Sequence, residues 1–511
     1  MATIVAMPSP TDDLPSGPAP ASDTAALNAS QPLAACLRAR LCARLCAHLQ
    51  ALERGLLERE TAARLLLLAA LAGEHVLLIG PPGTAKSELA RRLHRAFDGA
   101  RYFERLLTRF STPEELFGPL SLKALEDDRY ERLIDGYLPT AGIAFLDEVF
   151  KANSAILNAL LTLLNEREYD NGAARLHTPL ISVVGASNEA PADESLLAFH
   201  DRFLLRVPVA PVGDAAFAAL LQLDDRGAGL PLPAPITAAE RAHLLAARHG
   251  VALGDEALAA LSGLRQQCAA LGLTVSDRRW RQLVALMRCA AASEGRTALD
   301  GLDLWLAPFV VAPEAGVMPA IAQWLSTEVV QALPQALPWL EHAVTAFEGQ
   351  LDLEQRLPAE DGDSADDQAG KLALARSIGG AEAAYQGDTG AQQGMQRLRA
   401  APLEARQQRA FSPLHVATRM AQVAALAGRA AVARETVQAA HDALAARLAG
   451  RLWLPPTLAQ GWLDAHRQTL ALLDRQAARL TAVQAGFADL QIEPGSTEPA
   501  PAPVALALAA D

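Results

Sequence analysis

Short apolar runs alternate with helical stretches between residues 75 and 209, and this alternation predicts a parallel β-sheet covered by helices. Each run is bounded by turn residues and is apolar enough to be buried on both faces of a sheet. Five strands are expected, at His75–Ile79, Arg101–Leu107, Ile143–Leu146, Leu180–Ala186 and Leu204–Val207. We therefore predict an α/β domain with a five-stranded parallel sheet and helices on both of its faces.

Beyond the segment VPVAPVGD the apolar pattern becomes helical, and no further strands are expected. The pattern divides the chain into an α/β domain at 32–211, an all-helical domain at 212–312, and a C-terminal helical bundle at 313–350 and 413–490. Within the bundle, two long helices are expected at Pro413–Leu448 and Thr457–Leu490.

Three segments differ from this pattern in composition. Residues 1–31 and 491–511 are rich in Pro, Ala and Ser, and we expect both to be disordered. The stretch 351–412 begins with a strongly acidic run and is rich in Gln, Ala and Gly, which indicates a variable, solvated insert in the bundle.

Charge and cysteine content narrow the function classes. The net charge of −13 and the pI near 5.4 argue against a general nucleic-acid binder, because such proteins usually carry a basic surface that replaces counterions on phosphates. The five cysteines form no C-x-x-C pair and are best explained as small buried residues in a reducing compartment. No apolar run is long enough to span a bilayer and no signal peptide is recognisable, so a cytoplasmic location is expected.

The segment GPPGTAKS, Gly80–Ser87, directly follows the first expected strand and precedes a helix-forming stretch. It matches the phosphate-binding pattern G-x-x-x-x-G-K-[ST] except at Ala85, where the pattern has glycine. A working nucleotide site, a decayed one and a chance match are all open at this point. Because Ala85 adjoins Lys86, where the helix should begin, we expect a helical backbone there, which alanine tolerates. Lys86 would reach the β- and γ-phosphates and Ser87 would bind Mg²⁺.

A carboxylate pair, Asp147 and Glu148, ends the strand in AGIAFLDEVFKAN. An acid at this end of a strand beside a phosphate loop can hold Mg²⁺ through water, and the next acid can polarise an attacking water. An exposed pair at a strand end is the simpler alternative. The order and spacing of the two motifs favour a nucleotide hydrolase.

Four more polar residues are candidates for the same site. Asn188 follows the strand in LISVVGASNEA and could lie between the acids and the γ-phosphate, or simply end a turn. Arg202 precedes the last strand and could act on a neighbouring subunit's nucleotide, or pair with Asp201. Arg278 and Arg279 begin a helix, where a cation is unfavourable unless it meets an anion, so a phosphate contact and a surface ion pair are both open.

Together these motifs resemble the MoxR family of AAA+ ATPases: GPPGTAKS, FLDE, ASNE and DRF occur in this order and spacing, and alanine at position 85 is ordinary in that family. The segments TRFSTPEELFGPLSLKALEDDRYERLIDGYLP, ILNALLTLLNERE and VSDRRW look like the RavA subfamily. The resemblance covers about Ala51–Ala312. It implies an AAA+ α/β core with a helix-2 insert at about 118–139, followed by a helical lid.

The resemblance also implies roles for individual residues. Asp147 and Ser87 would hold Mg²⁺, Glu148 would activate the lytic water, Asn188 would be sensor 1, Arg202 the arginine finger, and Arg278 sensor 2, with Arg279 as the second choice. ATP or ADP would be bound by these residues: Leu56, Leu57, Gly80, Pro81, Pro82, Gly83, Thr84, Ala85, Lys86, Ser87 and Glu88. Leu56 and Leu57 would line the adenine pocket.

The partners implied are other copies of the chain in a hexameric ring and a von Willebrand A-domain protein of the ViaA type. RavA-like proteins of enteric bacteria also bind a lysine decarboxylase through a small inserted domain. The matching stretch here, 351–412, is poor in β-formers, so this partner is not expected. The leading prediction is an ATP-hydrolysing ring that remodels or matures protein clients. The alternatives are a nucleotide-gated scaffold with little hydrolysis and a DNA-directed AAA+ motor.

Overall fold

The computed structural model describes residues 40–189, 191, 196–223, 233–331, 338–356, 410–493, 495–496 and 499–504. The chain divides into two compact units, which are described separately. Unit 1 is Met1–Val329 with Gly450–Pro455, and unit 2 is Val330–Ala449 with Pro456–Asp511. The predicted N-terminal segment 1–31 and most of the predicted insert 351–412 lie outside the described residues.

A five-stranded parallel sheet forms the centre of unit 1, with the strand order β2-β3-β6-β1-β7. The strands are β1 (Val76–Ile79), β2 (Tyr102–Leu106), β3 (Ile143–Asp147), β6 (Ser182–Ser187) and β7 (Leu205–Pro208). All five expected strands are confirmed, with ends that differ from the predictions by at most two residues. Parallel pairing places all five carboxyl ends at one edge of the sheet and all five amino ends at the other.

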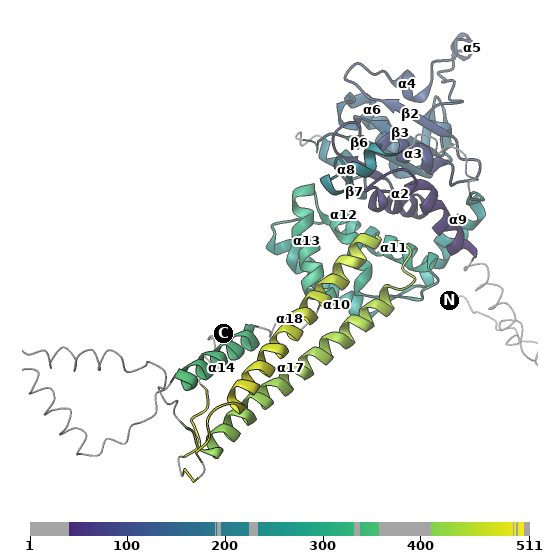
Figure 1. Ribbon diagram of the computed structural model, residues 1–511. Helices are drawn as coiled ribbons and strands as arrows, with labels where there is room; N and C mark the ends of the chain where they lie inside the picture. Colours follow the sequence, from purple (N-terminus) through teal and green to yellow (C-terminus); the bar gives the residue numbers. More distant parts are fainter. Residues whose placement is uncertain are drawn as a thin grey trace, which may run out of the picture. The chain divides into compact units, whose positions relative to one another are not determined.

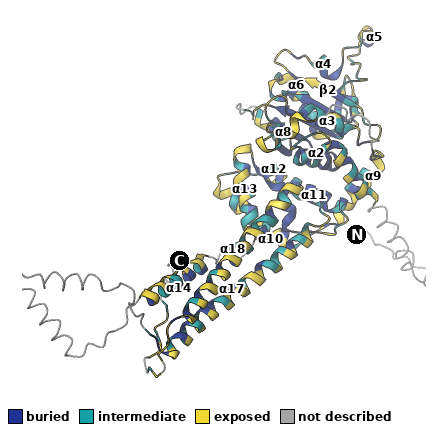
Figure 2. Cartoon of the chain, viewed as in Figure 1, coloured by how far each residue is buried: buried dark blue, intermediate teal, exposed yellow. Residues whose placement is uncertain are grey.

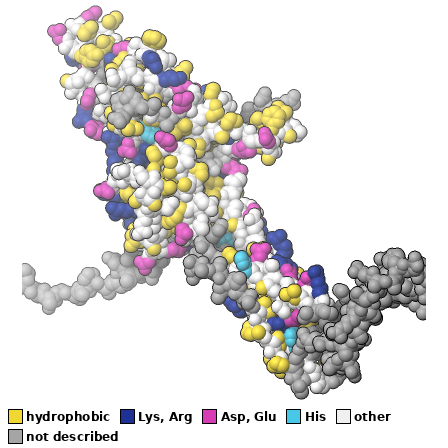
Figure 3. Space-filling model, turned by 90° about the vertical axis from the view of Figure 1, so that its left-hand side faces the viewer, with side chains coloured by type: hydrophobic (Ala, Val, Ile, Leu, Met, Phe, Trp, Pro, Cys, Tyr) yellow, Lys and Arg dark blue, Asp and Glu magenta, His cyan; other side chains and the backbone are white. Residues whose placement is uncertain are grey.

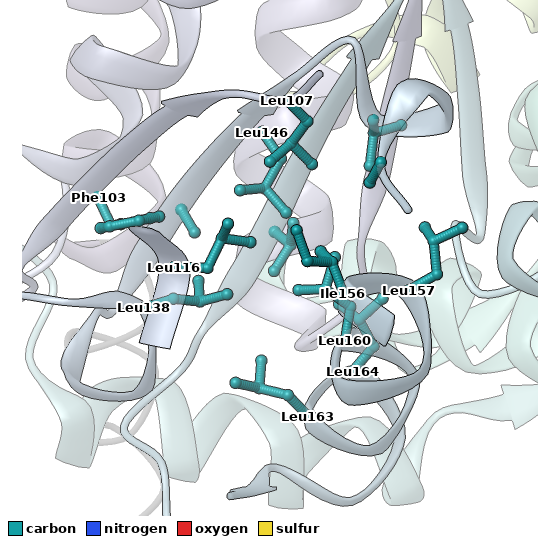
Figure 4. Packing of buried hydrophobic residues seen from close by; sticks show 14 of the residues in the cluster. Phe103, Leu107, Leu116, Leu138, Leu146, Ile156, Leu157, Leu160, Leu163 and Leu164 are labelled. Atoms are coloured by element: carbon teal, nitrogen blue, oxygen red, sulfur yellow. The ribbon is translucent and has the colours of Figure 1, made fainter. Parts of the chain in front are cut away.

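Helices cover the sheet and bury its apolar side chains (Figures 1 and 2). Helix α6 (Ser154–Glu166) places Ile156, Leu160 and Leu163 in a core cluster with Leu146 of β3, and all four are completely buried (Figure 4). Helix α3 (Lys86–His94) contacts β3, and α2 (Glu60–Ala72) contacts β1, β6 and β7. Burial of each such side chain stabilises the fold by about 1.5–3 kcal/mol, so this packing fixes the loops at the ends of the strands.

The predicted helix-2 insert is an excursion from the core that follows α4 (Pro113–Phe117) and carries α5 (Leu122–Glu126) (Figure 1). Its two arms are joined by backbone hydrogen bonds, such as Ser121 N to Glu131 O at 2.8 Å. A separate antiparallel hairpin, β4 (Glu168–Asn171) and β5 (Ala174–His177), was not expected from the sequence.

The helical part of unit 1, called the lid here, contains six α-helices among the described residues. They are α8 (Asp214–Leu221), α9 (Ala238–Ala247), α10 (Asp255–Ala270), α11 (Asp277–Ser293), α12 (Ala307–Val311) and α13 (Met318–Trp324). A π-helical segment, Leu325–Gln331, follows α13. The expectation of an all-helical domain is wrong in one detail, because β8 (Ala252–Leu253) and β9 (Ala298–Leu299) form a two-residue parallel pair.

Residues 450–455 pack within the lid although they lie far along the chain. Trp453 is 1% exposed and its indole Nε1 donates to Ser293 Oγ at 2.7 Å. Arg451 donates to Asp303 Oδ1 at 2.8 Å and also pairs with Asp300. The backbone N of Leu452 donates to the buried Glu294. This segment, called the connector here, therefore completes the lid.

Unit 2 consists of α14 (Pro338–Arg356), α17 (Pro413–Leu448) and α18 (Pro456–Ala488), which pack around a shared apolar core. Both predicted long helices are present at nearly the predicted residues. The expectation of a disordered tail from residue 491 is wrong for part of it, because Ile492 pairs with Phe411 and the carbonyl of Ala502 accepts from Arg419 at 2.9 Å. No described helix is long and apolar enough to cross a membrane.

Candidate functional site

Glycine is required at the first position of the phosphate-loop segment. Gly80 follows β1, and its backbone N donates to Ser187 O at 3.0 Å, which ties the loop to β6. A Cβ at this position would lie 2.1 Å from the carbonyl oxygen of Val209. Gly83 has a φ of +82°, in the left-handed region that glycine adopts without strain. Both glycines are therefore explained by the geometry of the turn.

Ala85 does not have the helical backbone that we expected. Its φ of 65° and ψ of 25° are left-handed, and it caps the amino end of α3, with its carbonyl accepting from Leu89 N. The prediction placed the start of the helix one residue too early. Left-handed residues in such a turn direct successive N–H groups toward one hollow, which is how backbone amides bind an anion. The loop keeps this shape with alanine, at the cost of local strain.

Lys86 crosses the loop that it ends. Its Nζ donates to the carbonyl oxygens of Gly80 at 2.5 Å and Pro81 at 2.9 Å, and the residue is 7% exposed. Burial lowers the pKa of Lys86, while the charges of Asp147 and Glu148 partly offset that effect. The amino group therefore lies in the loop, where the charges of the two acids act on it.

The carboxylate pair lies at the carboxyl end of β3. Glu148 has a φ of 51°, and its backbone N donates to Asp147 Oδ1 at 3.0 Å. A non-glycine residue in this region is strained by about 1–3 kcal/mol, and such strain is concentrated at functional sites. The two carboxylates therefore have different partners: that of Asp147 accepts from the backbone N of Glu148, whereas that of Glu148 accepts from a side chain of another strand end.

Two side chains hold the carboxylate of Glu148. Asn188, which follows β6, donates through Nδ2 to Oε1 of Glu148 at 2.7 Å. Lys151 pairs with Oε2 at 3.3 Å, a contact that sequence reasoning did not anticipate. The structure thus brings Lys86, Asp147, Glu148 and Asn188 together at the carboxyl-end edge of the sheet.

The segment expected to line an adenine pocket lies against the phosphate loop. Leu56 and Leu57 are half-buried and precede Glu58 and Arg59. Buried Arg59 donates to Thr84 O at 3.1 Å in the loop and to Ala210 O at 2.7 Å after β7. Arg59 was missed by sequence reasoning, since nothing in GLLERE separates it from a surface arginine.

Ser87 and Asp147 fit the expected magnesium site by chemistry. Mg²⁺ in nucleotide sites takes few protein ligands and keeps waters and phosphate oxygens. No cluster of three or more His, Cys, Asp or Glu suited to a metal occurs in the part of the chain that the structure describes. Glu88, also expected at the nucleotide, instead pairs with Arg92 at 2.8 Å and Arg91 at 3.4 Å.

Arg202 lies at the other edge of the sheet, just before β7. The four residues of β1 that separate the two edges correspond to roughly 13 Å. The Nε of Arg202 is buried without a hydrogen-bond partner among the residues that the structure describes. The alternative that Arg202 pairs with Asp201 is not observed, because Oδ1 of Asp201 accepts from Arg279 at 2.7 Å.

The alternative prediction, that Arg279 of the lid contacts a phosphate, is wrong. It is 4% exposed, and its guanidinium donates to the carbonyl oxygens of Leu204, Phe203 and Val310 as well as to Asp201. Every nitrogen of this side chain is used to join α11 to the start of β7 and to α12. Burial lowers the pKa of Arg279, and its bond to Asp201 partly compensates.

Arg278 is exposed and contacts only Asn165 Oδ1, at 3.4 Å, among the hydrogen bonds of the described residues. Asn165 follows Leu164, whose carbonyl hydrogen-bonds with His75 at the amino end of β1. Arg278 therefore lies at the same edge as Arg202 and away from Lys86. The structure does not bring it to the phosphate loop of its own chain.

Comparison with known families gives two matches. Residues 43–228 match the model described as "MoxR domain in the MoxR-vWA-beta-propeller ternary systems", and residues 256–323 match an AAA lid domain. The two matched regions correspond to the α/β core and to the lid.

Curated relatives match over the same part of the chain. The uncharacterized proteins MJ0812 and MJ0079 of Methanocaldococcus jannaschii are 44% and 42% identical over 48% of this chain, covering 66% and 64% of their own lengths. Protein MoxR of Paracoccus denitrificans is 31% identical over 33% of this chain and 52% of its own length. This chain thus spans less than two thirds of each relative. A crystal structure of a putative ATPase from Cytophaga hutchinsonii aligns over 57% of this chain and 98% of its own, with a TM-score of 0.48 and 14% identity.

Proposed function

We propose that this chain is an AAA+ ATPase of the MoxR family, since residues 43–228 match a MoxR domain and residues 256–323 an AAA lid domain. In this proposal it hydrolyses ATP in a ring of identical subunits and uses it to remodel or mature protein clients. The observation that carries the proposal is the contact between Asn188 and Glu148 at the edge that also holds Lys86 and Asp147. A phosphate loop, a magnesium ligand, a base and a polar side chain on that base are what phosphoryl transfer to water requires.

Each residue has a definite role in the proposed reaction. The loop Gly80–Ser87 binds the phosphates, with Lys86 exchanging its contacts to loop carbonyls for phosphate oxygens. Ser87 and Asp147 hold Mg²⁺, which neutralises charge on the phosphates when bound. Glu148 orients the attacking water and accepts its proton, and Asn188 fixes the carboxylate that does so.

The ring is proposed because the site of one chain is incomplete. Arg202, the expected arginine finger, lies at the edge opposite Lys86 and so does not reach the nucleotide of its own chain. In a ring, the Arg202 edge of one copy faces the nucleotide of the next. A hexamer is the family expectation for such a ring.

The partner proposed is a von Willebrand A-domain protein, since the matched family model describes MoxR domains that occur with such proteins. The finer RavA-like assignment rests on sequence motifs alone, and the region of its decarboxylase-binding insert lies mostly outside the described residues. Co-purification of this chain with a von Willebrand A-domain protein from the same cell tests the partner.

Phosphate release from ATP and Mg²⁺ by the full chain tests the activity. Glu148→Gln should lower turnover by about 100-fold or more while nucleotide binding is kept, because it removes the base and preserves the shape. Glu166→Gln is the matched control, since that carboxylate is exposed at the end of α6.

Three outcomes would decide against the proposal. Wild-type turnover no higher than that of Glu148→Gln would exclude hydrolysis at this site. Nucleotide-dependent assembly without hydrolysis would support the scaffold alternative. Strong stimulation of turnover by DNA at low salt would favour a DNA-directed motor over a protein remodeller.

A further inference from the structure

Helix α8 exposes nearly all of its apolar side chains. Its sequence is DAAFAALL, and none of its residues is buried. Phe217 is 52% exposed, Leu221 71% and Leu220 38%, and Leu223, just after the helix, is 39% exposed. Hydrophobic side chains are exposed at several places on the face seen in Figure 3. An apolar helix exposed in this way indicates an interaction surface.

The helix begins beside the nucleotide site. Gly213, its N-cap, donates its backbone N to Oε2 of Glu58 at 2.9 Å. Glu58 is next to Arg59, which holds both the phosphate loop at Thr84 and the strand exit at Ala210. The apolar surface and the proposed nucleotide site therefore share one edge of unit 1.

A pocket of about 810 Å³ lies at the other edge, next to Arg278. Trp280, Val284 and Ala285 of α11 supply its apolar wall. Its charged lining consists of four arginines, one histidine and two carboxylates: Arg248, Arg278, Arg281, Arg288, His249, Glu74 and Asp277. The Nε of Arg288 is buried without a partner among the described residues. The pocket thus offers an apolar wall within a mainly basic rim.

We propose that α8 of one copy docks into this pocket of the neighbouring copy. Phe217 and Leu221 would pack on the wall formed by Trp280 and Val284, and the carboxylate of Asp214 in the first turn of α8 would meet the basic rim. The proposal rests on the proposed function, because a ring in which Arg202 and Arg278 serve the next nucleotide requires these two edges to face each other.

The contact is heterologous: each copy uses α8 on one side and the pocket on the other. Such contacts generate rings when the rotation closes. Buried aromatic and aliphatic anchors account for most of the binding energy of protein interfaces, so loss of two anchors should weaken assembly at least tenfold.

The first experiment compares the assembly of the full chain and of Phe217→Ser/Leu221→Ser by sedimentation velocity with ATP and Mg²⁺. We expect wild type to assemble, and the variant to remain monomeric at a tenfold higher concentration while it binds a fluorescent ADP analogue normally. Val432→Ser, which removes an equally exposed apolar side chain on α17, should assemble as wild type.

The second experiment identifies the pocket as the docking site. Val284→Asp, measured alone, should also fail to assemble. Its binding of the fluorescent ADP analogue shows whether it folds. Trp280→Ala is a second pocket variant for the same measurement. An equimolar mixture of the α8 variant and a pocket variant retains one intact contact per pair. The mixture should therefore show more turnover than the two proteins measured separately.

The outcomes separate the docking from the function. If wild type hydrolyses ATP and Phe217→Ser/Leu221→Ser assembles equally well, the docking is wrong and the ATPase stands. Lack of any gain in the mixture overturns the pairing of α8 with this pocket. If wild type lacks hydrolysis, sedimentation still tests the docking, and a wild type that stays monomeric with nucleotide overturns it.

Discussion

The side-chain amide of Asn188 donates to Oε1 of Glu148 at 2.7 Å, and this contact joins the ends of two neighbouring strands, β6 and β3. The two residues are 40 positions apart in the sequence. Their meeting follows from parallel pairing of Ile143 with Ser182 and of the residues after them, which brings both strand ends to one edge. The strands thus set the orientation of the proposed base.

Asn188→Ala should lower the rate constant of ATP hydrolysis by about 10-fold or more, because Glu148 loses the donor that orients its carboxylate. Nucleotide affinity should change by less than about twofold, since the phosphate loop is untouched. Single-turnover hydrolysis and binding of a fluorescent ADP analogue measure the two quantities separately. A loss of affinity that matches the loss of rate would contradict a positioning role.

Lys151→Ala is the matched control for that experiment. It removes the other contact of the Glu148 carboxylate, but Lys151 is 58% exposed and such pairs contribute little. Turnover should fall by less than in Asn188→Ala. Equal losses would indicate that any contact to Glu148 is sufficient to orient it.

Ala85→Gly should stabilise the protein by up to about 1 kcal/mol. Alanine is strained at a φ of 65°, and glycine relieves this strain, although it adds entropy to the unfolded chain. Ala90→Gly, the same substitution in the interior of α3, should instead destabilise by about 1 kcal/mol or more. Urea denaturation measures both changes, and changes of the same sign would contradict the left-handed conformation.

Arg279→Met should destabilise unit 1 by about 3–5 kcal/mol, because it leaves the carbonyl groups of Leu204, Phe203 and Val310 without their buried donor. Arg278→Met, one residue earlier, should change the free energy of unfolding by less than about 0.5 kcal/mol. ATP turnover should instead fall more in Arg278→Met than in Arg279→Met if Arg278 contacts the nucleotide of a neighbouring copy. Similar unfolding curves for the two variants would rule out the structural role of Arg279.

His200 should make the protein less stable as the pH falls below 6.5. Burial, together with the charges of Arg206 and Arg279, lowers the pKa of His200 to about 3. Between pH 6.5 and 3 the unfolded chain therefore binds a proton that the folded chain does not, which costs about 1.4 kcal/mol of stability for each pH unit.

The measurement for His200 is denaturation of wild type and His200→Gln at pH 7.5 and pH 5. Any stability advantage of wild type should be about 2 kcal/mol smaller at pH 5, since the variant lacks the titrating ring. Parallel stability profiles of the two proteins would show that the histidine is protonated in the folded state as readily as in the unfolded chain.

The sequence allowed prediction of the sheet because its strands are buried on both faces. Leu146 and Val183, for example, are completely buried, and short apolar runs between turn residues are typical of such strands. The hairpin of β4 and β5 could not be found in this way. Its strands EYDN and ARLH are only four residues long, and Tyr169 is their only buried residue, so they leave too short an apolar pattern to be recognised.

Predictions for the site depended on where each residue lies along its strand. Lys86, Asp147, Glu148 and Asn188 follow the carboxyl ends of strands, so their meeting could be inferred. The positions of Arg278 and Arg279 depend on how the lid packs on the core. No local pattern in the sequence encodes that packing. Ala85 was misjudged because a one-residue difference in the start of a helix changes the backbone from right-handed to left-handed.

The connector has a consequence for how the protein is made. Arg451 and Trp453 complete contacts to Asp303 and Ser293, and both partners are translated long before them. The lid therefore leaves the ribosome before Arg451, one of the two arginines that pair with Asp303. The side chain of Asp303 is 3% exposed in the finished fold. The nascent lid must wait until residue 455 emerges before it reaches its final stability. A protein that binds the lid during this interval would meet a surface different from that of the mature lid.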